Sequence, residues 1–299
     1  MKKRILAAVD GSEQSLDAIR HAGGVLFPGS TELILCHIMP RKPPVYSDNT
    51  DVSLQQAYSA WFHKVRQAAD CAMSAARSAA DAAGFLAKDV RLKCQPAMAG
   101  VARDILEEAY KADCDAVLMG RRGLGAIDHF LMGSVSNRLV EQSRLPLWLV
   151  EGRHLPPGVL VGINNSEEAL AAVDVLGFML EDRPEIPVTL LYVQPPALLA
   201  GQPDPSICAG SEAEKDFPFL AKAKEELMKA GLAEGNIRVS ACRRGRDPAR
   251  ELLREAHEGG HGTVVTGRRG LRGMKAFLLG SISSRLISRA RQMAVWVIP

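Results

Sequence analysis

Residues 120–139 and residues 267–286 are near copies of each other, so this chain is built from two similar units. The two stretches read GRRGLGAIDHFLMGSVSNRL and GRRGLRGMKAFLLGSISSRL, and they agree at twelve of twenty positions with an offset of 147 residues. A self-match this dense indicates duplication. A chain of 299 residues also has room for two domains of ordinary size. We expect domains over residues 1–151 and 158–299, joined by a short polar, proline-bearing linker.

The order of predicted elements is the same in both copies. Short, continuous apolar runs alternate with helical patterns, which is typical of parallel strands covered on both faces. Right-handed crossovers then favour a doubly wound sheet. We therefore predict an α/β protein of two tandem doubly wound five-stranded parallel-sheet domains, each with strand order 3-2-1-4-5. The predicted strands lie at residues 5–9, 33–38, 90–94, 116–119 and 147–150, and at 159–163, 188–193, 237–241, 263–266 and 294–298.

A repeated G-x2-G-x9-G-S motif gives the strongest chemical signal. In both copies it begins directly after an apolar strand and ends where a helical pattern opens. Glycines let phosphate oxygens approach backbone N–H groups closely, and a helix N-terminus adds free donors and a positive dipole end. The motif predicts phosphate binding; the alternative is that its glycines only cap a helix and tighten a turn. The candidate residues are Gly120, Arg121, Gly123, Gly133, Ser134, Val135 and Ser136, and Gly267, Arg268, Gly270, Gly280, Ser281 and Ser283.

The first predicted strand leads into Asp10-Gly11-Ser12. In a sheet ordered 3-2-1-4-5 the first and fourth strands are neighbours, and ligands of open α/β sheets bind where the strand order reverses between them. We therefore expect Asp10 and Gly120 on opposite sides of one crevice, where the carboxylate can accept from a ribose hydroxyl or an adenine amino group. The alternative is that Asp10 or Ser12 caps the helix that follows.

These residues resemble those of the universal stress proteins, and the likeness covers nearly the whole chain. It rests on the opening strand with Asp-Gly-Ser, on the G-x2-G-x9-G-[ST] motif and on the five-strand layout. The resemblance implies an adenine nucleotide α-hydrolase-like fold and a regulatory role in stress. The family's ATP-binding branch uses the motif for the phosphates and ribose, which implies ATP (or AMP or ADP) as the ligand. The candidate residues beside the motif are Asp10, Gly11, Ser12 and Ile38.

The resemblance also bears on metal and on assembly. Mg is the usual companion of ATP oxygens and needs few protein ligands, so we expect it with the nucleotide. Family members commonly pair domains through their last strands. We therefore expect either such pairing inside this chain or a homodimer.

The second copy departs from the family pattern at its first strand. Asn164 stands where the first copy has Asp10, and Asn165 stands in place of Gly11. Asparagine still accepts through its oxygen but lacks the charge. Since a charged hydrogen bond contributes roughly 1.5–3 kcal/mol, we expect nucleotide chiefly in the first copy.

Two other kinds of function compete with nucleotide-dependent regulation. One is an enzyme on the same sheet, at most a slow ATPase, but we find no HxGH, SGGxDS or GxxxxGK[ST] motif and no repeated nucleophile–base–orienter set. The other is a nucleotide-free, partner-binding protein. His257-Glu258-Gly259-Gly260-His261 matches the HExxH zinc pattern, but its glycines predict a helix end instead.

Composition and charge bear on the protein's partners and on its location in the cell. A formal charge of +3 is too small to favour nucleic acid. The apolar run at residues 5–9 is too short for a signal peptide, and no stretch reaches the length of a membrane span. The six cysteines lie far apart, so we expect them reduced and mostly buried. We expect a cytoplasmic protein.

Overall fold

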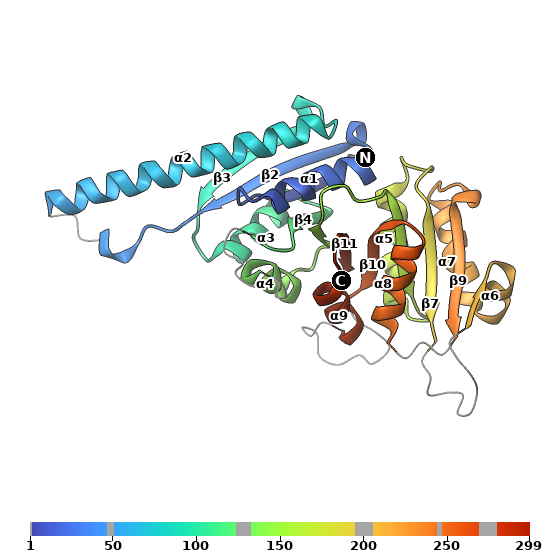
Figure 1. Cartoon of the computed structure of the whole chain (residues 1–299). Coiled ribbons are helices and arrows are strands. Elements are labelled where there is room, and N and C mark those ends of the chain that lie inside the picture. The colour runs from blue at the N-terminus through green and yellow to red at the C-terminus, as the bar shows by residue number, and fades with distance from the viewer. Residues whose placement is uncertain (1, 47–50, 124–132, 195–205, 244–246, 269–279) are drawn as a thin grey trace.

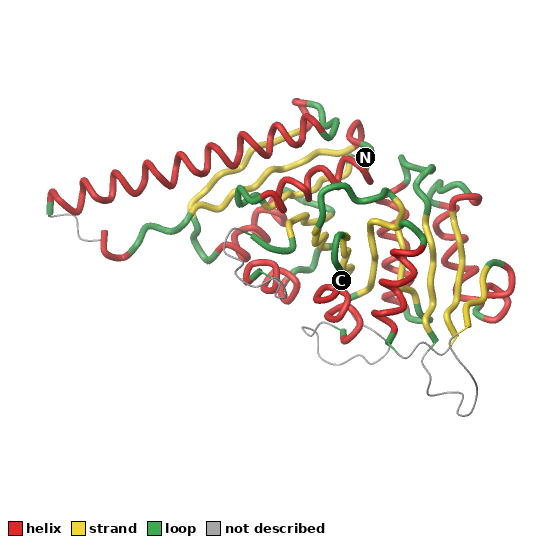
Figure 2. The backbone as a smooth tube through the Cα atoms, in the orientation of Figure 1, coloured by secondary structure: helices red, strands yellow, loops and turns green. Residues whose placement is uncertain are grey.

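The computed structural model describes residues 2–46, 51–123, 133–194, 206–243, 247–268 and 280–299. Within these residues, eleven strands form one sheet in the order β3-β2-β1-β4-β5-β11-β10-β6-β7-β9-β8 (Figure 1). Helices cover both faces of this sheet (Figure 2). The sheet is therefore shared by the two halves of the chain.

Each half contributes five parallel strands in the predicted order 3-2-1-4-5. The strands of the first half are β1 (Lys3–Ala8), β2 (Thr31–Met39), β3 (Val90–Pro96), β4 (Ala116–Gly120) and β5 (Leu147–Glu151). Those of the second half are β6 (Gly158–Ile163), β7 (Val188–Val193), β9 (Ile237–Arg243), β10 (His261–Gly267) and β11 (Met293–Ile298). The predicted fold class is confirmed. Sequence patterns missed β8 (Ser206–Ala209), a short edge strand antiparallel to β9.

The helices lie in two layers because strand side chains alternate between the two faces of the sheet. Ile5 and Ala7 of β1 belong to one core, and Leu6 between them belongs to the other. The first core includes residues of α1 (Glu13–Val25), α2 (Val52–Ala82), α5 (Glu167–Leu180), α6 (Ser211–Asp216) and α7 (Pro218–Lys229). The second includes α3 (Val101–Lys111), α4 (Ser134–Gln142), α8 (Pro248–Glu258) and α9 (Ser281–Arg289). Both cores continue from one half into the other.

The halves join through their last strands. β5 and β11 pair antiparallel, with Trp148 directly opposite Trp296. The two indole rings are fully buried and stacked, with centroids 3.7 Å apart and planes 5° apart. The pairing of last strands expected from the family resemblance is therefore present inside the chain. A homodimer stays a prediction.

Helix α2 is longer than the domain it covers. Its first buried residue is Ala69, and the turns that precede it extend past the neighbouring strands (Figure 1). The carboxyl end of α2 lies next to Gly84, which has a positive φ of 90°. No helix among the described residues is long and apolar enough to cross a bilayer.

The HExxH-like segment is a helix end, as predicted. α8 stops at Glu258, and His261 opens strand β10, so the two histidines belong to different elements. The described residues contain no group of three His, Cys, Asp or Glu side chains that could hold a metal ion. The sequence has a basic cluster of Arg243, Arg244 and Arg246, of which Arg244 and Arg246 lie outside the described residues, as does the end of the Pro43–Asn49 loop.

Candidate functional site

A cavity of about 490 Å³ opens at the carboxyl ends of β6, β7 and β10, beside the N-terminus of α9. This is the place where the strand order reverses in the second half, between β6 and β10. Its walls combine apolar side chains with a few polar groups, as ligand pockets commonly do. Five of the residues predicted from sequence line it: Asn164, Gly267, Gly280, Ser281 and Ser283.

Asn164 is a polar residue of the cavity wall with an unsatisfied hydrogen-bond acceptor. Its Oδ1 atom is buried and has no hydrogen-bond partner. Leaving a buried acceptor unsatisfied costs about 1–3 kcal/mol, and a ligand donor would recover that cost. Leu191 and Val193 of β7, which belong to the same core, also line the cavity and provide an apolar surface of the kind that a flat ring can cover.

The N-terminus of α9 forms one side of the cavity. Gly280 is its N-cap and has no side chain that could accept from the first-turn N–H groups. The Gly280 N–H itself donates to the Arg268 carbonyl at 2.8 Å. Ser281 opens the helix at the cavity. Gly270, the remaining glycine of the motif, lies outside the described residues.

The equivalent place in the first half brings Asp10 and Gly123 together. A Cβ atom built on Gly123 would overlap Asp10 Oδ2, so a side chain at this position would require the carboxylate to move. Asp10 Oδ1 accepts from the N–H and hydroxyl of Ser12, at 3.0 and 2.6 Å. The helix cap itself is Ser12, which accepts from the Ser15 N–H. The alternative role is therefore performed by Ser12, while Asp10 faces the glycine motif.

The other predicted residues of the first half surround this point. Gly11 has a positive φ of 86° and packs against Ala72 of α2, a conformation that favours glycine. Ile38 is the residue before the last of β2, near the carboxyl end of that strand, and is the counterpart of cavity-lining Val193. Gly133 is the N-cap of α4 and, like Gly280, provides no side-chain cap. Ser134 and Val135 form the first turn that follows it.

Gly120 has a packing role. A Cβ atom there would lie 2.8 Å from the Gln14 backbone, so β4 approaches α1 too closely for any side chain. By contrast, a Cβ atom on Gly133 would meet nothing closer than 3.5 Å. The two glycines of one motif therefore have different roles. Gly120 allows β4 to pack closely on α1, and Gly133 leaves the N-terminus of α4 open.

Four of the predicted side chains hydrogen-bond to backbone carbonyls of the protein itself. Ser136 donates to the Gly120 carbonyl at 3.4 Å, and Ser283 donates to the Gly267 carbonyl at 2.7 Å, so both hydroxyls tie a helix to a strand end. The buried guanidinium groups of Arg121 and Arg268 cross to the opposite half. Both were predicted beside the phosphates, but the hydrogen bonds from their Nη atoms go to carbonyls of a helix in the opposite half.

Comparisons with known proteins agree with this architecture. The sequence model described as "Universal stress protein family" matches residues 1–151 and again residues 158–299. The chain belongs to the universal stress protein family. A Staphylococcus aureus (strain USA300) protein named for this family is 27% identical over 157 residues, which cover 52% of this chain and 87% of the relative.

Two solved structures match nearly the whole chain. A universal stress protein from Archaeoglobus fulgidus DSM 4304 superposes with a TM-score of 0.66 at 17% identity, covering 99% of this chain and 97% of that one. A functionally unknown Pseudomonas aeruginosa PAO1 protein superposes with a TM-score of 0.55 at 12% identity, covering 99% and 92%. At such identities the likeness establishes the fold.

Sequence reasoning missed the charged residue of the second-half cavity. Arg285 lines it and lies 3.4 Å from Asp247, which also pairs with Arg289. Burial raises the pKa of Asp247, but the hydrogen bond from Arg289 and the charges of both arginines outweigh it and hold the pKa below its usual value. A signal was present, because Arg285 and Arg138 occupy the same position of the duplicated segment.

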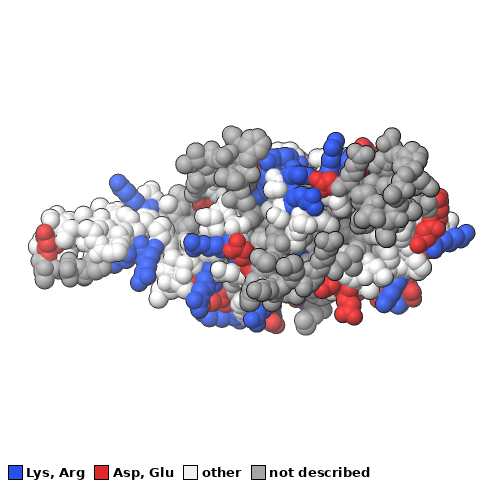
Figure 3. Space-filling model, turned by 90° about the horizontal axis from the view of Figure 1, so that it is seen from below, with Lys and Arg blue, Asp and Glu red and all other residues white. Residues whose placement is uncertain are grey.

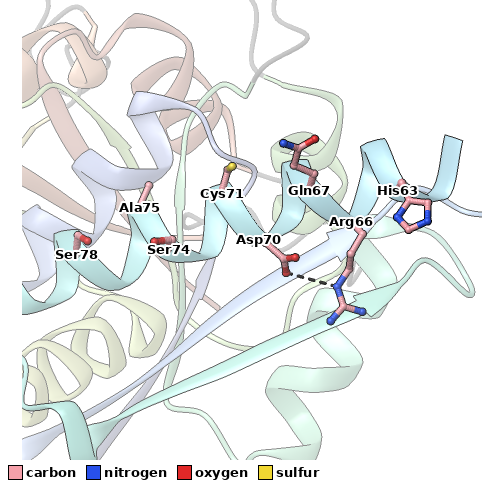
Figure 4. Close-up of a pocket in the computed structure, with 8 residues that line it drawn as sticks. All are labelled: His63, Arg66, Gln67, Asp70, Cys71, Ser74, Ala75 and Ser78. Carbon is pink, nitrogen blue, oxygen red and sulfur yellow. Dashed lines mark ion pairs between the residues drawn. The ribbon is translucent and has the colours of Figure 1, made fainter. Parts of the chain in front are cut away.

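A second hollow, of about 700 Å³, follows the outer face of α2 (Figure 4). All eight residues that line it belong to this one helix, and Arg66 and Asp70 form an ion pair across one turn at 3.5 Å. It is a shallow surface, separate from the carboxyl ends of the strands. On the face drawn in Figure 3, basic side chains lie in several groups interleaved with acidic ones.

Proposed function

We propose that this protein binds an adenine nucleotide, ATP in the first instance, as a regulatory ligand in a stress response. The observation that carries the proposal is the second-half cavity, where an unsatisfied Asn164 oxygen, the motif glycines and an uncapped helix N-terminus line one space. A volume of about 490 Å³ is within the range of about 300–1,000 Å³ typical of small-molecule sites.

The two ends of the cavity suit the two ends of a nucleotide. The uncapped first turn of α9 offers N–H donors and a positive dipole end to phosphates. The apolar side chains of Leu191 and Val193 offer a surface to the base. Asn164 also lines the cavity and can accept from a ribose hydroxyl or an amino group. Mg would be held mainly by the phosphates.

We propose that the first half binds the same ligand more tightly. Its α4 N-terminus is uncapped in the same way, and Asp10 supplies a charged acceptor where the second half has neutral Asn164. Charge-assisted hydrogen bonds are roughly twice as strong as neutral ones. We therefore expect Asn164→Asp to tighten second-half binding by about tenfold or more, measured by calorimetric titration of the variant and the parent.

The proposal is tested by denaturing the purified protein and identifying the released nucleotide by chromatography. Gly133→Asp is the sharpest variant, because the site has space for a side chain but the new carboxylate would stand before the helix N-terminus and repel phosphate. Gly133→Ala is the matched control for adding a side chain without charge. We expect ATP, ADP or AMP from the parent and less from Gly133→Asp. No nucleotide from the parent, and no thermal shift with added ATP and Mg, would refute the proposal.

A further inference from the structure

Arg121 joins its own glycine motif to a helix of the opposite half. Its backbone carbonyl accepts the Gly133 N–H at 3.2 Å, which fixes the N-cap of α4. Its guanidinium Nη1 donates to the carbonyls of Ile287 and Ala290 at 2.7 and 2.6 Å. These carbonyls lie at the carboxyl end of α9, the helix whose N-terminus lines the second-half cavity. Arg121 thus links the N-cap of α4 to the carboxyl end of α9.

Arg268 repeats the arrangement in the other direction. Its carbonyl accepts the Gly280 N–H at 2.8 Å, which fixes the N-cap of α9. Its guanidinium donates to the Ser143 carbonyl at 2.7 Å and also to the Glu141 carbonyl. These carbonyls lie at the carboxyl end of α4. Each arginine therefore hydrogen-bonds the carboxyl end of a helix in the opposite half, across the β5–β11 junction. We call these two sets of contacts the arginine clamps.

Both arginines are buried and charged. Arg121 is 4% exposed and Arg268 is 7% exposed. Burial, together with the charges of Arg291 and Arg122, lowers the pKa of Arg121 to about 10, which leaves it protonated at neutral pH. Glu151 pairs with both Arg121 and Arg122. A cation at a helix carboxyl end interacts favourably with the helix dipole, so each clamp stabilises the helix that it reaches.

We propose that the two nucleotide sites are coupled through Arg121 and Arg268, so that filling one site tightens the other. This inference rests on the proposed nucleotide binding. Phosphate at the N-terminus of α4 fixes a short helix whose other end is held by Arg268, and Arg268 in turn positions Gly280 in the second site. Binding of the first ligand loses conformational entropy by ordering these helices. The second ligand then binds helices that are already ordered, so its binding carries a smaller entropy loss. By linkage, the effect is reciprocal.

The coupling factor can be measured with native mass spectrometry, using ATP and Mg as the probe. Populations of the free and doubly occupied parent give the overall constant for double occupancy. Gly280→Asp and Gly133→Asp give the constants of each site with the other blocked. The overall constant divided by the product of those two is the coupling factor. We expect at least about fivefold in the parent, the lower end of typical allosteric coupling.

The arginine variants identify the route. Arg268→Met should bring the coupling factor close to one while both sites still bind. Arg121→Lys, which keeps the charge beside Glu151 but loses the paired donors, should reduce it in the same direction. Arg122→Met is the matched control, because the Arg122 ion pair with Glu151 stays within the first half. It should leave the factor unchanged. A factor of one in the parent, or one that Arg268→Met does not alter, would overturn the coupling while leaving nucleotide binding in place.

Hydrogen exchange tests the clamps without nucleotide. Arg268→Met should raise amide exchange in α4, in the half that does not contain the substitution, by about fivefold or more, while α8 of its own half stays protected. Unchanged exchange in α4 would overturn the proposal. If neither half binds ATP but α4 responds, the proposed function fails while the structural link between the halves stands.

Discussion

Lowering the pH should weaken the junction between the halves through a single histidine, His21. This residue of α1 is buried against the second half: Nε2 lies 3.3 Å from the Thr263 hydroxyl, and the ring meets the edge of Trp296 with centroids 6.4 Å apart. Burial lowers the pKa of His21 from 6.5 to about 4. His21 therefore binds a proton less readily in the native protein than in the unfolded chain.

The sign and size follow from proton linkage. Above pH 6.5 neither state binds the proton and the full stability is present; as the pH falls toward 4, the unfolded state gains protons first and stability is lost. With these two pKa values, the loss between about pH 7.5 and about pH 5 is about 2 kcal/mol at 25 °C.

Urea unfolding of the parent and of His21→Val at both pH values measures this contribution. Valine occupies the equivalent helix position of the second half, Val175, nine residues after the capping serine. The parent should lose about 2 kcal/mol more than the variant on acidification, whatever the variant costs at neutral pH. Replacing exposed His63 by valine should not alter the loss. Equal losses in the parent and His21→Val, within about 0.5 kcal/mol, would refute the reasoning.

Three further predictions concern packing and reactivity. Trp148→Ala should cost about 3–5 kcal/mol in urea unfolding, since it removes a fully buried ring from the stack that joins the halves; a cost under about 1 kcal/mol would contradict the shared core. Gly120→Ala should lower the free energy of unfolding by about 1–3 kcal/mol, because the new Cβ atom meets the Gln14 backbone. Gly133→Ala should change it by less than about 0.5 kcal/mol, and equal melting temperatures of the two variants would contradict this difference. Exposed Cys71 should be alkylated in the native protein, while Cys36 and Cys114, buried and with pKa raised to about 12, should react only after unfolding, as peptide mapping would establish.

Much of this fold is predictable from local patterns. The continuous apolar strands and the repeated motif lead to ten strands and their order, because parallel strands with right-handed crossovers allow few arrangements. The cavity also follows, since Asn164, Gly267 and Gly280 all lie where strands end at one edge of the sheet. Edge strand β8 was missed because it is only four residues long.

The destinations of long side chains were not predictable. Arg121 stands in a glycine motif, so local reasoning sends it to phosphate, but the β5–β11 pairing places the end of α9 within its reach. His21 reads as an ordinary helix residue until the second half packs over it. Both depend on how the halves meet, and that arrangement is a property of three-dimensional contacts far apart in sequence.

We propose that backbone N–H groups at the N-termini of α4 and α9 hold phosphate. A crystal structure grown with excess ATP and Mg would show whether they do. We expect phosphate oxygens within hydrogen-bond distance of the first-turn amides of α4 and α9, with the base near Ile38 in one half and Val193 in the other. Phosphates bound elsewhere, or protein side chains filling both crevices, would contradict it.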